Sequence, residues 1–407
     1  MLGSGSNDDI VTHAKSNDLI KRKGSFWHNP ASCPNEESAM RAKAVISREI
    51  NKPVVVEQIE VAPPRVGEVM VKLAACGVCH SDLSATNGTI PFPPPLILGH
   101  EGAGVIVEVG PGVSDFAVGD HVLSSFVTMC GVCHYCTVGR PALCDVGAKT
   151  LYTLPTGDLR TSDASGAPLN IFSGVGVMAE YATLSTRSII RIPKDAPLKQ
   201  ASLVGCGVMT GFCAATNTAR VEPGSIVVVF GCGGVGLSAI QGSAVSGAGM
   251  IVAVDIDDFK LELAKLMGAT HTVNSKGDDN LIKTLKKLTG GGADHALECV
   301  GSGELVATAY GVLRKGGKAV VVGVARPKDM TTFRTASMTF EEKTLTGSYF
   351  GSARPREDAP RILALYKSGR VKLDELVTRT YSIDEAPQAF ADLEAGKNAR
   401  GVILFDA

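Results

Sequence analysis

Four cysteines lie within a stretch of fifteen residues, CGVCHYCTVGRPALC, at positions 130–144. The first three, Cys130, Cys133 and Cys136, are separated by two-residue gaps, and Cys144 follows after seven more residues. Such short gaps let thiolates converge on one tetrahedral metal ion, and four thiolates close the site to water. The spacing therefore predicts a structural zinc site, although an iron–sulfur cluster is also held by four thiolates.

A second set of metal-ligating residue types is dispersed over three motifs. The motifs are CGVCHSD at 76–82, LGHEGAG at 98–104 and LVGCGVMTG at 203–211. They contain Cys76, Cys79, His80, Asp82, His100, Glu101 and Cys206. Two thiolates, one imidazole and an open fourth position would form a catalytic zinc site. The spacing of the motifs does not by itself tell which of these residues meet.

A glycine-rich turn follows the apolar run SIVVVF at 225–230 and precedes a helix-like segment. The turn reads GCGGVG, and its G-x-G-x-x-G spacing is made by Gly231, Gly233 and Gly236, with Gly234 and Val235 between them. This strand–turn–helix context is typical of a turn that holds the pyrophosphate of a dinucleotide at a helix N-terminus. We therefore predict a dinucleotide cofactor.

The choice between NAD and NADP is predicted from the acid that ends the next apolar run. Asp255 lies nineteen residues beyond Gly236 and would accept hydrogen bonds from the ribose hydroxyls of the adenosine. Asp257 would repel a 2′-phosphate, and no arginine is near it in the sequence. These residues predict NAD.

The predicted secondary structure around these motifs differs between the first and the second half of the chain. Between residues 40 and 207, short strand-like runs are separated by proline and glycine, which predicts a β-rich domain. Between 208 and 349, apolar strands alternate with helical segments, which predicts a parallel sheet with helices on both faces. The mixed segment 350–407 is assigned to the β-rich domain, and residues 1–39 form an N-terminal extension.

The bulk composition excludes several classes of protein. A chain of 407 residues is long for one core, and 44% hydrophobic residues with a mean hydropathy of +0.16 indicate a globular protein. Lysine plus arginine (40) balance aspartate plus glutamate (41), so the charge indicates neither nucleic acid nor an anionic membrane as a partner. The apolar runs are too short to span a bilayer.

The cysteine content predicts the cellular compartment. The sequence has eleven cysteines, an odd number, and its N-terminus lacks the apolar segment of a secretory signal. Clustered cysteines then indicate metal ligands in a reducing compartment rather than disulfides. We therefore expect a cytoplasmic protein.

Taken together, the motifs resemble those of the zinc-containing alcohol dehydrogenases of the medium-chain dehydrogenase/reductase superfamily. The resemblance covers about residues 40–407 and is carried by GVCHSD, GHEGAG, the four-cysteine loop, GCGVMTG, GCGGVG and RGVI. It implies an α/β protein with a GroES-like catalytic domain and a doubly wound Rossmann domain. It also implies two zinc ions per chain, NAD and, from the long segment between Cys144 and Tyr181, a homodimer.

The resemblance assigns roles at the metal centre. The ligands of the catalytic zinc would be Cys79, His100 and Cys206. Glu101 beside them would be a transient ligand, whereas Cys76 matches no ligand position and is assigned to packing.

The resemblance also assigns a proton relay. Asp82 would orient the histidine ligand, and Ser81 would take the proton of the substrate. At Ser84 the sequence departs from many relatives, which have a histidine that ends the relay. The relay would instead run from Ser81 through the cofactor ribose to water or through another base, and we expect a weaker relay and a stronger dependence of the rate on pH.

Cofactor and substrate contacts follow from the same resemblance. Beyond the glycine turn and Asp255, cofactor contacts would come from His80, Thr210, Lys260, Val324 and Arg400. The substrate pocket would be lined by Ile90, Phe126, Phe172, Val324 and Tyr349. Apolar and aromatic walls favour an uncharged substrate.

The implied activity is reversible hydride transfer between NAD and a primary alcohol (aromatic, allylic or medium-chain aliphatic), which gives the aldehyde. A glutathione-dependent formaldehyde dehydrogenase is an alternative, although the segment DVGAKTLYTLPTGD after Cys144 lacks the arginine expected to bind a glutathione carboxylate. Further alternatives are a non-catalytic zinc-stabilised binding protein and a zinc-independent dinucleotide reductase. The expected partners are a small alcohol or aldehyde and a second copy of the chain, with no nucleic acid and no membrane.

Overall fold

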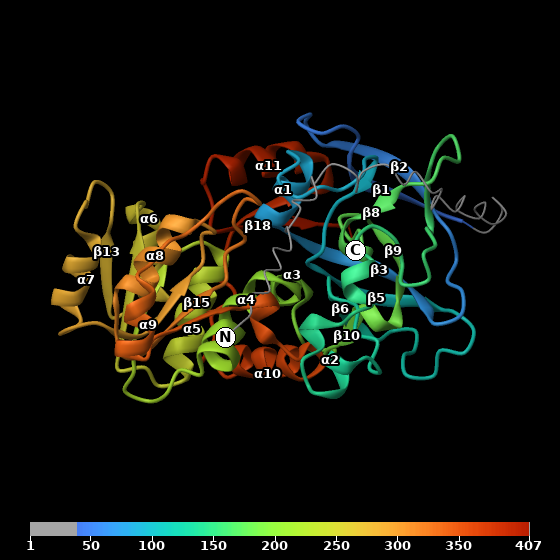
Figure 1. Cartoon of the computed structure of the whole chain (residues 1–407). Helices are drawn as coiled ribbons and strands as arrows, with labels where there is room; N and C mark the ends of the chain where they lie inside the picture. The colour runs from blue at the N-terminus through green and yellow to red at the C-terminus, as the bar shows by residue number, and fades with distance from the viewer. Residues whose placement is uncertain (1–38, 407) are drawn as a thin grey trace, which may run out of the picture. The chain divides into compact units, whose positions relative to one another are not determined.

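The structure is a computed structural model that describes residues 39–406 (Figure 1). These residues belong to one compact unit. The predicted N-terminal extension, 1–39, lies outside the described residues except for its last residue. Within the described range, no helix combines the length and the apolar character that crossing a bilayer requires.

A six-stranded parallel sheet is formed in the second half of the chain. Its strands are β11 (Ile226–Phe230), β12 (Met250–Asp255), β13 (His271–Asn274), β14 (Ala293–Glu298), β15 (Leu313–Val321) and β16 (Thr344–Gly347). They are ordered β13-β12-β11-β14-β15-β16, and all neighbouring pairs are parallel. The strands β12 and β13 lie on one side of β11, and the later strands β14, β15 and β16 lie on its other side. This order confirms the predicted doubly wound sheet.

Helices cover both faces of this sheet. They are α5 (Gly234–Val245), α6 (Asp258–Leu266), α7 (Leu281–Leu288), α8 (Gly303–Gly311) and α9 (Thr335–Glu341). Val227 and Val229 of β11 share one buried cluster with Leu237 of α5. Val228 and Phe230, which point to the opposite face, share another cluster with residues of α7 and α8. Because both faces of these strands are buried, their residues are apolar at successive positions. This is the reason for the continuous apolar runs in this part of the sequence.

Two further sheets are built mainly from the first half of the chain. The five-stranded sheet has the order β7-β2-β1-β4-β8 and contains β1 (Met40–Ser47), β2 (Val55–Val61), β4 (Leu96–Ile97), β7 (Thr161–Asp163) and β8 (Asn170–Ile171). The seven-stranded sheet has the order β10-β6-β5-β3-β18-β17, with β9 also paired to β3. Its strands are β3 (Glu68–Val78), β5 (Gly102–Val109), β6 (His121–Ser124), β9 (Tyr181–Ser185), β10 (Ile189–Arg191), β17 (Val377–Ser382) and β18 (Arg400–Leu404). Because β18 pairs antiparallel with β3, the C-terminal strand returns to the sheet that holds the first metal motif.

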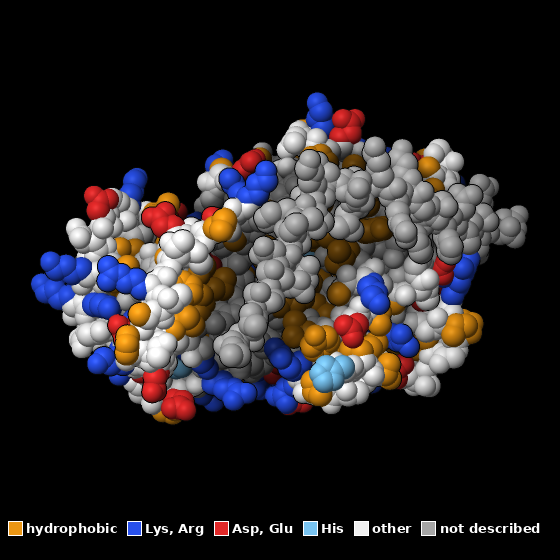
Figure 2. Space-filling model, in the orientation of Figure 1, with side chains coloured by type: hydrophobic (Ala, Val, Ile, Leu, Met, Phe, Trp, Pro, Cys, Tyr) orange, Lys and Arg blue, Asp and Glu red, His pale blue; other side chains and the backbone are white. Residues whose placement is uncertain are grey.

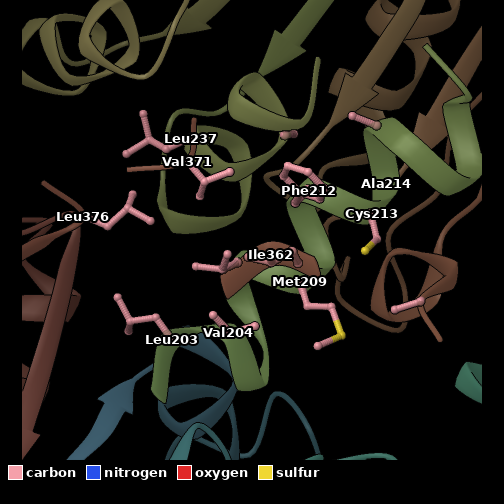
Figure 3. Close-up of a cluster of buried hydrophobic side chains, with 14 of the residues drawn as sticks. Leu203, Val204, Met209, Phe212, Cys213, Ala214, Leu237, Ile362, Val371 and Leu376 are labelled. Carbon is pink, nitrogen blue, oxygen red and sulfur yellow. The ribbon is translucent and has the colours of Figure 1, made fainter. Parts of the chain in front are cut away.

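The remaining α-helices lie outside the segments that link the strands of the parallel sheet. They are α1 (His80–Thr86), α2 (His134–Thr137), α3 (Leu198–Ser202), α4 (Gly207–Cys213), α10 (Pro355–Lys367) and α11 (Ala386–Glu394). Figure 3 shows Phe212 of α4 near Leu237 of α5 and Ile362 of α10, in one buried cluster. A β-carbon on Gly211 would lie 1.9 Å from the carbonyl oxygen of Val235, so glycine allows α4 to contact the first turn of α5.

Candidate active site

Four side chains of metal-ligating type converge in the β-rich part of the chain. One ligand atom from each of Cys79, His100, Glu101 and Cys206 lies within 4.8 Å of the other three. Cys79 precedes α1 and Cys206 precedes α4, whereas the other two lie between β4 and β5. Three separate loops therefore contribute to one group, and these are the residues that the sequence analysis assigned to the catalytic zinc.

His100 is oriented by a buried carboxylate. Its Nδ1 atom lies 3.2 Å from Asp82 Oδ2, and both side chains are at most 2% exposed. Asp82 is held in turn by the backbone N–H groups of Gly99 (2.9 Å) and Cys79 (3.2 Å). Although burial opposes a charged ring, Asp82 raises the pKa of His100. The other ring nitrogen, Nε2, is buried and has no hydrogen-bond partner in residues 39–406.

This donor set fits a zinc ion. Two thiols and an imidazole are the Cys₂His combination of catalytic zinc sites, which keep the fourth position open. The orphaned Nε2 atom of His100 favours a metal, because a buried nitrogen without a partner is otherwise costly. Glu101 is already engaged: one of its oxygens accepts from the Gly207 N–H at 3.1 Å and the other pairs with Arg400. Burial raises the pKa of Glu101 to about 7.

The predicted proton acceptor lies at the edge of this group. The Ser81 hydroxyl is 3.8 Å from Cys79 Sγ, in the first turn of α1. Ser84, where many relatives have a histidine, lies further along the same helix. Cys76 is buried on β3 and is not a member of the converging group.

Arg400 connects the candidate metal centre with the glycine turn. It is buried in β18 and pairs with Glu101, which precedes it by 299 residues. A β-carbon on Gly234, the first residue of α5, would lie 2.4 Å from Arg400 Cδ. One on Gly207 would lie 2.4 Å from Nη1 of the same guanidinium. The positive charge therefore stands at the N-terminus of α5, where a pyrophosphate would bind.

The glycine turn leaves part of its backbone accessible to a ligand. Gly231 has a φ of +85°, and a β-carbon on Gly236 would lie 1.7 Å from the Gly231 carbonyl oxygen. A β-carbon on Gly233 would meet nothing within 4 Å. Beneath the turn, Asp255 Oδ2 accepts from the Cys232 N–H at 2.7 Å. Since the backbone at Gly233 is free to contact a ligand, the turn fits the pyrophosphate of a dinucleotide.

Both acids after β12 also hold the local backbone. Oδ1 of Asp255 accepts from the N–H groups of Ile256 (2.8 Å) and Asp257 (3.1 Å). Asp257 caps α6, because its side chain accepts from the Phe259 N–H at 3.0 Å. Asp257 was predicted only to repel a phosphate, and its capping role was not predicted.

Three of the other predicted cofactor contacts are His80, Lys260 and Thr210. Burial lowers the pKa of His80; the nearby Cys79 opposes this shift, whereas the charges of Arg400 and Lys260 add to it. The charges of Arg400 and Lys260 therefore both act on His80. Thr210 lies in α4, and its N–H donates to the Cys206 carbonyl at 2.8 Å.

Aromatic side chains flank the ring of His100. The ring centroids of Phe126 and Phe172 lie 5.8 Å and 5.1 Å from it, both in edge-on contact. Tyr349 contacts Phe126 at 6.0 Å, and Ile90 packs against the buried cluster that contains Phe172. Four of the five predicted pocket residues thus lie on or behind this aromatic wall.

Val324, the fifth predicted pocket residue, lies in the segment after β15. It is 71% exposed, and its carbonyl oxygen lies 2.4 Å from the position of a β-carbon on Gly301, after β14. Two aromatic residues of the wall were missed: Phe92 contacts Phe172 at 4.7 Å, and Phe350 contacts Phe126 at 4.3 Å. The sequence signals for them were a phenylalanine inside the proline run PFPPP at 91–95 and an aromatic residue next to Tyr349.

The four-cysteine loop forms a second group. One Sγ atom from each of its cysteines lies within 4.8 Å of the other three, in the set Cys130, Cys133, Cys136 and Cys144. The Cys133 N–H also donates to Cys130 Sγ at 3.3 Å. A closed set of four thiols fits a structural metal.

Replacing Cys136 with serine is expected to release the metal of this loop and to lower the free energy of unfolding by at least about 4 kcal/mol, since loss of a structural metal is among the largest single-residue effects. Elemental analysis and denaturant unfolding measure the two changes. Val132→Ser is the control, because Val132 is 81% exposed on the same loop and should alter neither quantity. Full metal content in the Cys136 variant would contradict the assignment.

Comparison with known proteins decides the family. Residues 65–194 match the alcohol dehydrogenase GroES-like domain, and residues 234–368 match the zinc-binding dehydrogenase family. An NDMA-dependent alcohol dehydrogenase of Amycolatopsis methanolica is 43% identical over 372 residues, which are 90% of this chain and 100% of that protein. The chain belongs to the zinc-containing alcohol dehydrogenase family. The predicted family and fold class are therefore confirmed, and the chain is an oxidoreductase.

Two further relatives are named for the substrates on which they act. The crystal structure of benzyl alcohol dehydrogenase from Acinetobacter calcoaceticus has a TM-score of 0.83 at 34% identity and covers 90% of this chain and 100% of that one. The S-(hydroxymethyl)glutathione dehydrogenase of Paracoccus denitrificans is 36% identical over 386 residues, which are 90% of this chain and 100% of that protein. Family membership indicates zinc and a nucleotide cofactor.

Proposed function

We propose that this alcohol dehydrogenase transfers hydride reversibly between a primary alcohol and NAD, giving the aldehyde. The substrates would be aromatic, allylic or medium-chain aliphatic alcohols. The observation that carries the proposal is the orphaned Nε2 atom of His100, which belongs to the group with Cys79 and Cys206 and is flanked by aromatic rings. An apolar wall beside an open metal site suits an uncharged alcohol.

The chain's own residues prepare the site for this reaction. A zinc ion bound by Cys79, His100 and Cys206 would act as a Lewis acid that lowers the pKa of the alcohol, and NAD would accept the hydride. Donation of the Nδ1 proton of His100 to Asp82 would leave the lone pair of Nε2 for a metal. Ser81, whose hydroxyl group lies beside Cys79, would accept the proton of the alcohol while passing its own proton onward through the cofactor ribose to water.

The preference for NAD rests on the acid after β12. Asp255 is held by three backbone N–H groups, so its carboxylate is fixed beneath the turn where the ribose of the adenosine would lie. A 2′-phosphate would meet this negative charge and that of Asp257. Two zinc ions per chain are proposed from the two converging groups of ligands.

The assembly is proposed to be a homodimer. The segment between Cys144 and Tyr181 is long, as in the dimeric members that the sequence resembles, and it supplies β7 and β8 to the five-stranded sheet. A reducing compartment is proposed because all ten cysteines of the described residues are free.

The glutathione-dependent activity is the second candidate, and the relative from Paracoccus denitrificans favours it. The structure supplies an argument against it. Arg160, the arginine that follows the loop after Cys144, is buried and pairs with Glu68 through Nε (2.8 Å) and Nη2 (3.1 Å). That guanidinium is therefore not free to bind a glutathione carboxylate.

A steady-state assay tests the proposal. Ethanol, hexanol, benzyl alcohol, an allylic alcohol, a secondary alcohol and S-hydroxymethylglutathione are each offered with NAD and with NADP. Because one relative is named for its dependence on NDMA, each assay is run with and without that compound. We expect NAD-linked oxidation of benzyl alcohol and hexanol. Activity confined to the glutathione adduct would support the second candidate. If zinc-loaded protein turns over none of these compounds, a non-catalytic zinc-stabilised binding protein becomes the better interpretation.

A further inference from the structure

The aromatic turn, residues 348–352, lies between β16 and α10 and has an unusual backbone conformation. Phe350, Gly351 and Ser352 are three consecutive residues with positive φ, of 51°, 69° and 52°. Glycine adopts this left-handed region readily, whereas other residues remain there only where their surroundings hold them. Because two of the three residues are not glycine, contacts from outside the turn must hold its backbone in place.

The hydroxyl of Thr218 contacts both ends of the aromatic turn. Its Oγ1 atom lies 2.7 Å from Oγ of Ser348, and it donates to Oγ of Ser352 at 2.9 Å. A hydroxyl donates one hydrogen bond and accepts others, so Ser348 would donate to Thr218 while Thr218 donates to Ser352. One side chain thus clamps the turn at its first and its last residue.

Thr218 lies in a helical segment that is itself irregular. The segment Ala214–Ala219 continues α4 as a π-helix and is followed by Arg220, which has a φ of +57°. Short π-helical turns next to α-helices are frequently found at functional sites. The Nζ atom of Lys318, on β15, donates to the carbonyl oxygen of Ala219 at 3.2 Å. The end of the helix that carries Thr218 is therefore anchored to the parallel sheet.

The clamped turn contributes two aromatic side chains to the wall beside His100. Phe350 is 2% exposed, and its ring centroid lies 4.3 Å from that of Phe126. Tyr349 is 52% exposed, and its ring meets Phe126 edge-on at 6.0 Å. Phe126 in turn contacts the ring of His100 at 5.8 Å. The buried ring thus fixes the turn to the wall, and the Tyr349 ring next to it is accessible to a ligand.

Close packing against α4 brings the aromatic turn to the candidate metal centre. A β-carbon on Gly351 would lie 2.6 Å from the carbonyl oxygen of Thr210 and 2.9 Å from that of Met209. Both residues lie near the start of α4, which begins directly after Cys206. Burial, and then the charge of Cys206, raise the pKa of Tyr349. The turn therefore borders the helix that follows a predicted zinc ligand.

We propose that Thr218 is a positioning residue for aromatic substrates. Its hydroxyl holds the aromatic turn so that Phe350 stays in the wall and Tyr349 offers its ring to the ring of the substrate. The inference deepens the proposed function and rests on it in taking an aromatic alcohol as the substrate. Aromatic rings in edge-on or offset contact stabilise one another beyond the area that they bury. Loss of the clamp should therefore weaken binding of a substrate ring without weakening binding at the metal.

The test compares two uncharged amides that differ in the aromatic ring. Benzamide and acetamide each offer one carbonyl oxygen to the metal, and NADH reduces neither of them. Each is titrated into zinc-loaded, NADH-saturated wild type, Thr218→Val and Thr218→Ser, and binding is followed by the fluorescence of the bound NADH. Basic and acidic side chains are intermixed on the described part of the face shown in Figure 2, and uncharged probes are little affected by either.

The expected losses are confined to the ligand that carries a ring. Thr218→Val should raise the Kd for benzamide at least about fivefold and the Kd for acetamide less than about twofold, as expected for one aromatic contact. In turnover it should raise KM for benzyl alcohol and leave kcat unchanged, because binding is lost equally in the ground and the transition state. Thr218→Ser, which keeps the hydroxyl, should bind both amides as wild type does. Equal losses for both amides, no loss for benzamide, or a Thr218→Ser protein as impaired as Thr218→Val would overturn the proposal.

A matched control separates the clamp from the helix that carries it. Thr216 lies on the same π-helix, and its hydroxyl donates to Oδ1 of the adjacent Asn217 at 3.0 Å. Thr216→Val should leave both Kd values unchanged. Where Thr218→Val does not fold, Ser352→Gly replaces it and should show the same selective loss. Glycine removes the acceptor of the Thr218 hydroxyl and tolerates the positive φ.

This inference and the proposed function fail in different ways. If wild type binds benzamide no more tightly than acetamide, the aromatic part of the proposed function fails, and this inference fails with it. If wild type prefers benzamide and Thr218→Val keeps the same preference, only the role of Thr218 fails.

Discussion

Replacement of Cys206 with serine is expected to lower kcat/KM for alcohol oxidation at least about 10³-fold and to remove one metal ion per chain. A Lewis acid contributes several kcal/mol of transition-state stabilisation, and each 1.36 kcal/mol is about tenfold in rate. Cys206 is buried and belongs to the group with Cys79 and His100. Steady-state kinetics and elemental analysis measure the two losses.

The control for this variant is Cys76→Ala. Cys76 is as buried as Cys206 and lies on β3 just before Cys79, but it is outside the converging group. We expect its replacement to leave the metal content unchanged and kcat/KM within about threefold. If Cys76→Ala loses a metal ion while Cys206→Ser keeps it, the ligand assignment is wrong.

Replacement of Ser81 with alanine is expected to lower kcat about 10²- to 10⁴-fold, the usual contribution of a positioned group that accepts a proton. The hydroxyl lies 3.8 Å from Sγ of Cys79, one of the predicted zinc ligands. Metal content and the Kd for NADH should not change, because the side chain is neither a predicted ligand nor a part of the glycine turn. Stopped-flow measurement of hydride transfer separates this step from product release.

Two companion variants sharpen the Ser81 prediction. Ser81→Thr keeps the hydroxyl and should retain kcat within about tenfold of wild type. Ser84→Ala removes a hydroxyl from the same helix, α1, and should have little effect because the structure does not place Ser84 in the metal group. A Ser81→Ala enzyme with wild-type kcat would exclude this residue from the proton path.

The four-cysteine loop and the glycine turn were predictable because their chemistry is local. Two-residue gaps hold Cys130, Cys133 and Cys136 within reach of one ion, whatever the rest of the chain does. In the turn, Gly231 needs its positive φ and Gly236 its missing β-carbon for reasons that lie within six residues. The apolar runs likewise predicted the parallel sheet, since strands buried on both faces tolerate few polar residues.

The catalytic group was not predictable from spacing. The motifs offered seven candidate ligands, and the resemblance to a family was needed to choose among them. In the structure the choice follows from sheet pairing and helix packing, because three loops meet at one point and leave Cys76 on β3 outside it. The aromatic wall was likewise not predictable from spacing. Phe92 and Phe350 are distant in sequence, yet each contacts a ring that touches His100.

The sequence by itself determined the four-cysteine metal loop, the cofactor turn and the order of elements, because each depends on neighbours a few positions apart. Only the tertiary structure decided which distant residues act together. Arg400 reaches Glu101 because β18 pairs with β3, and it reaches the glycine turn because Gly234 leaves room for its side chain. Glu298 joins the segments after β14 and β15 only because these two strands lie side by side. Such contacts depend on strand pairing and close packing across the whole chain, which no local spacing encodes.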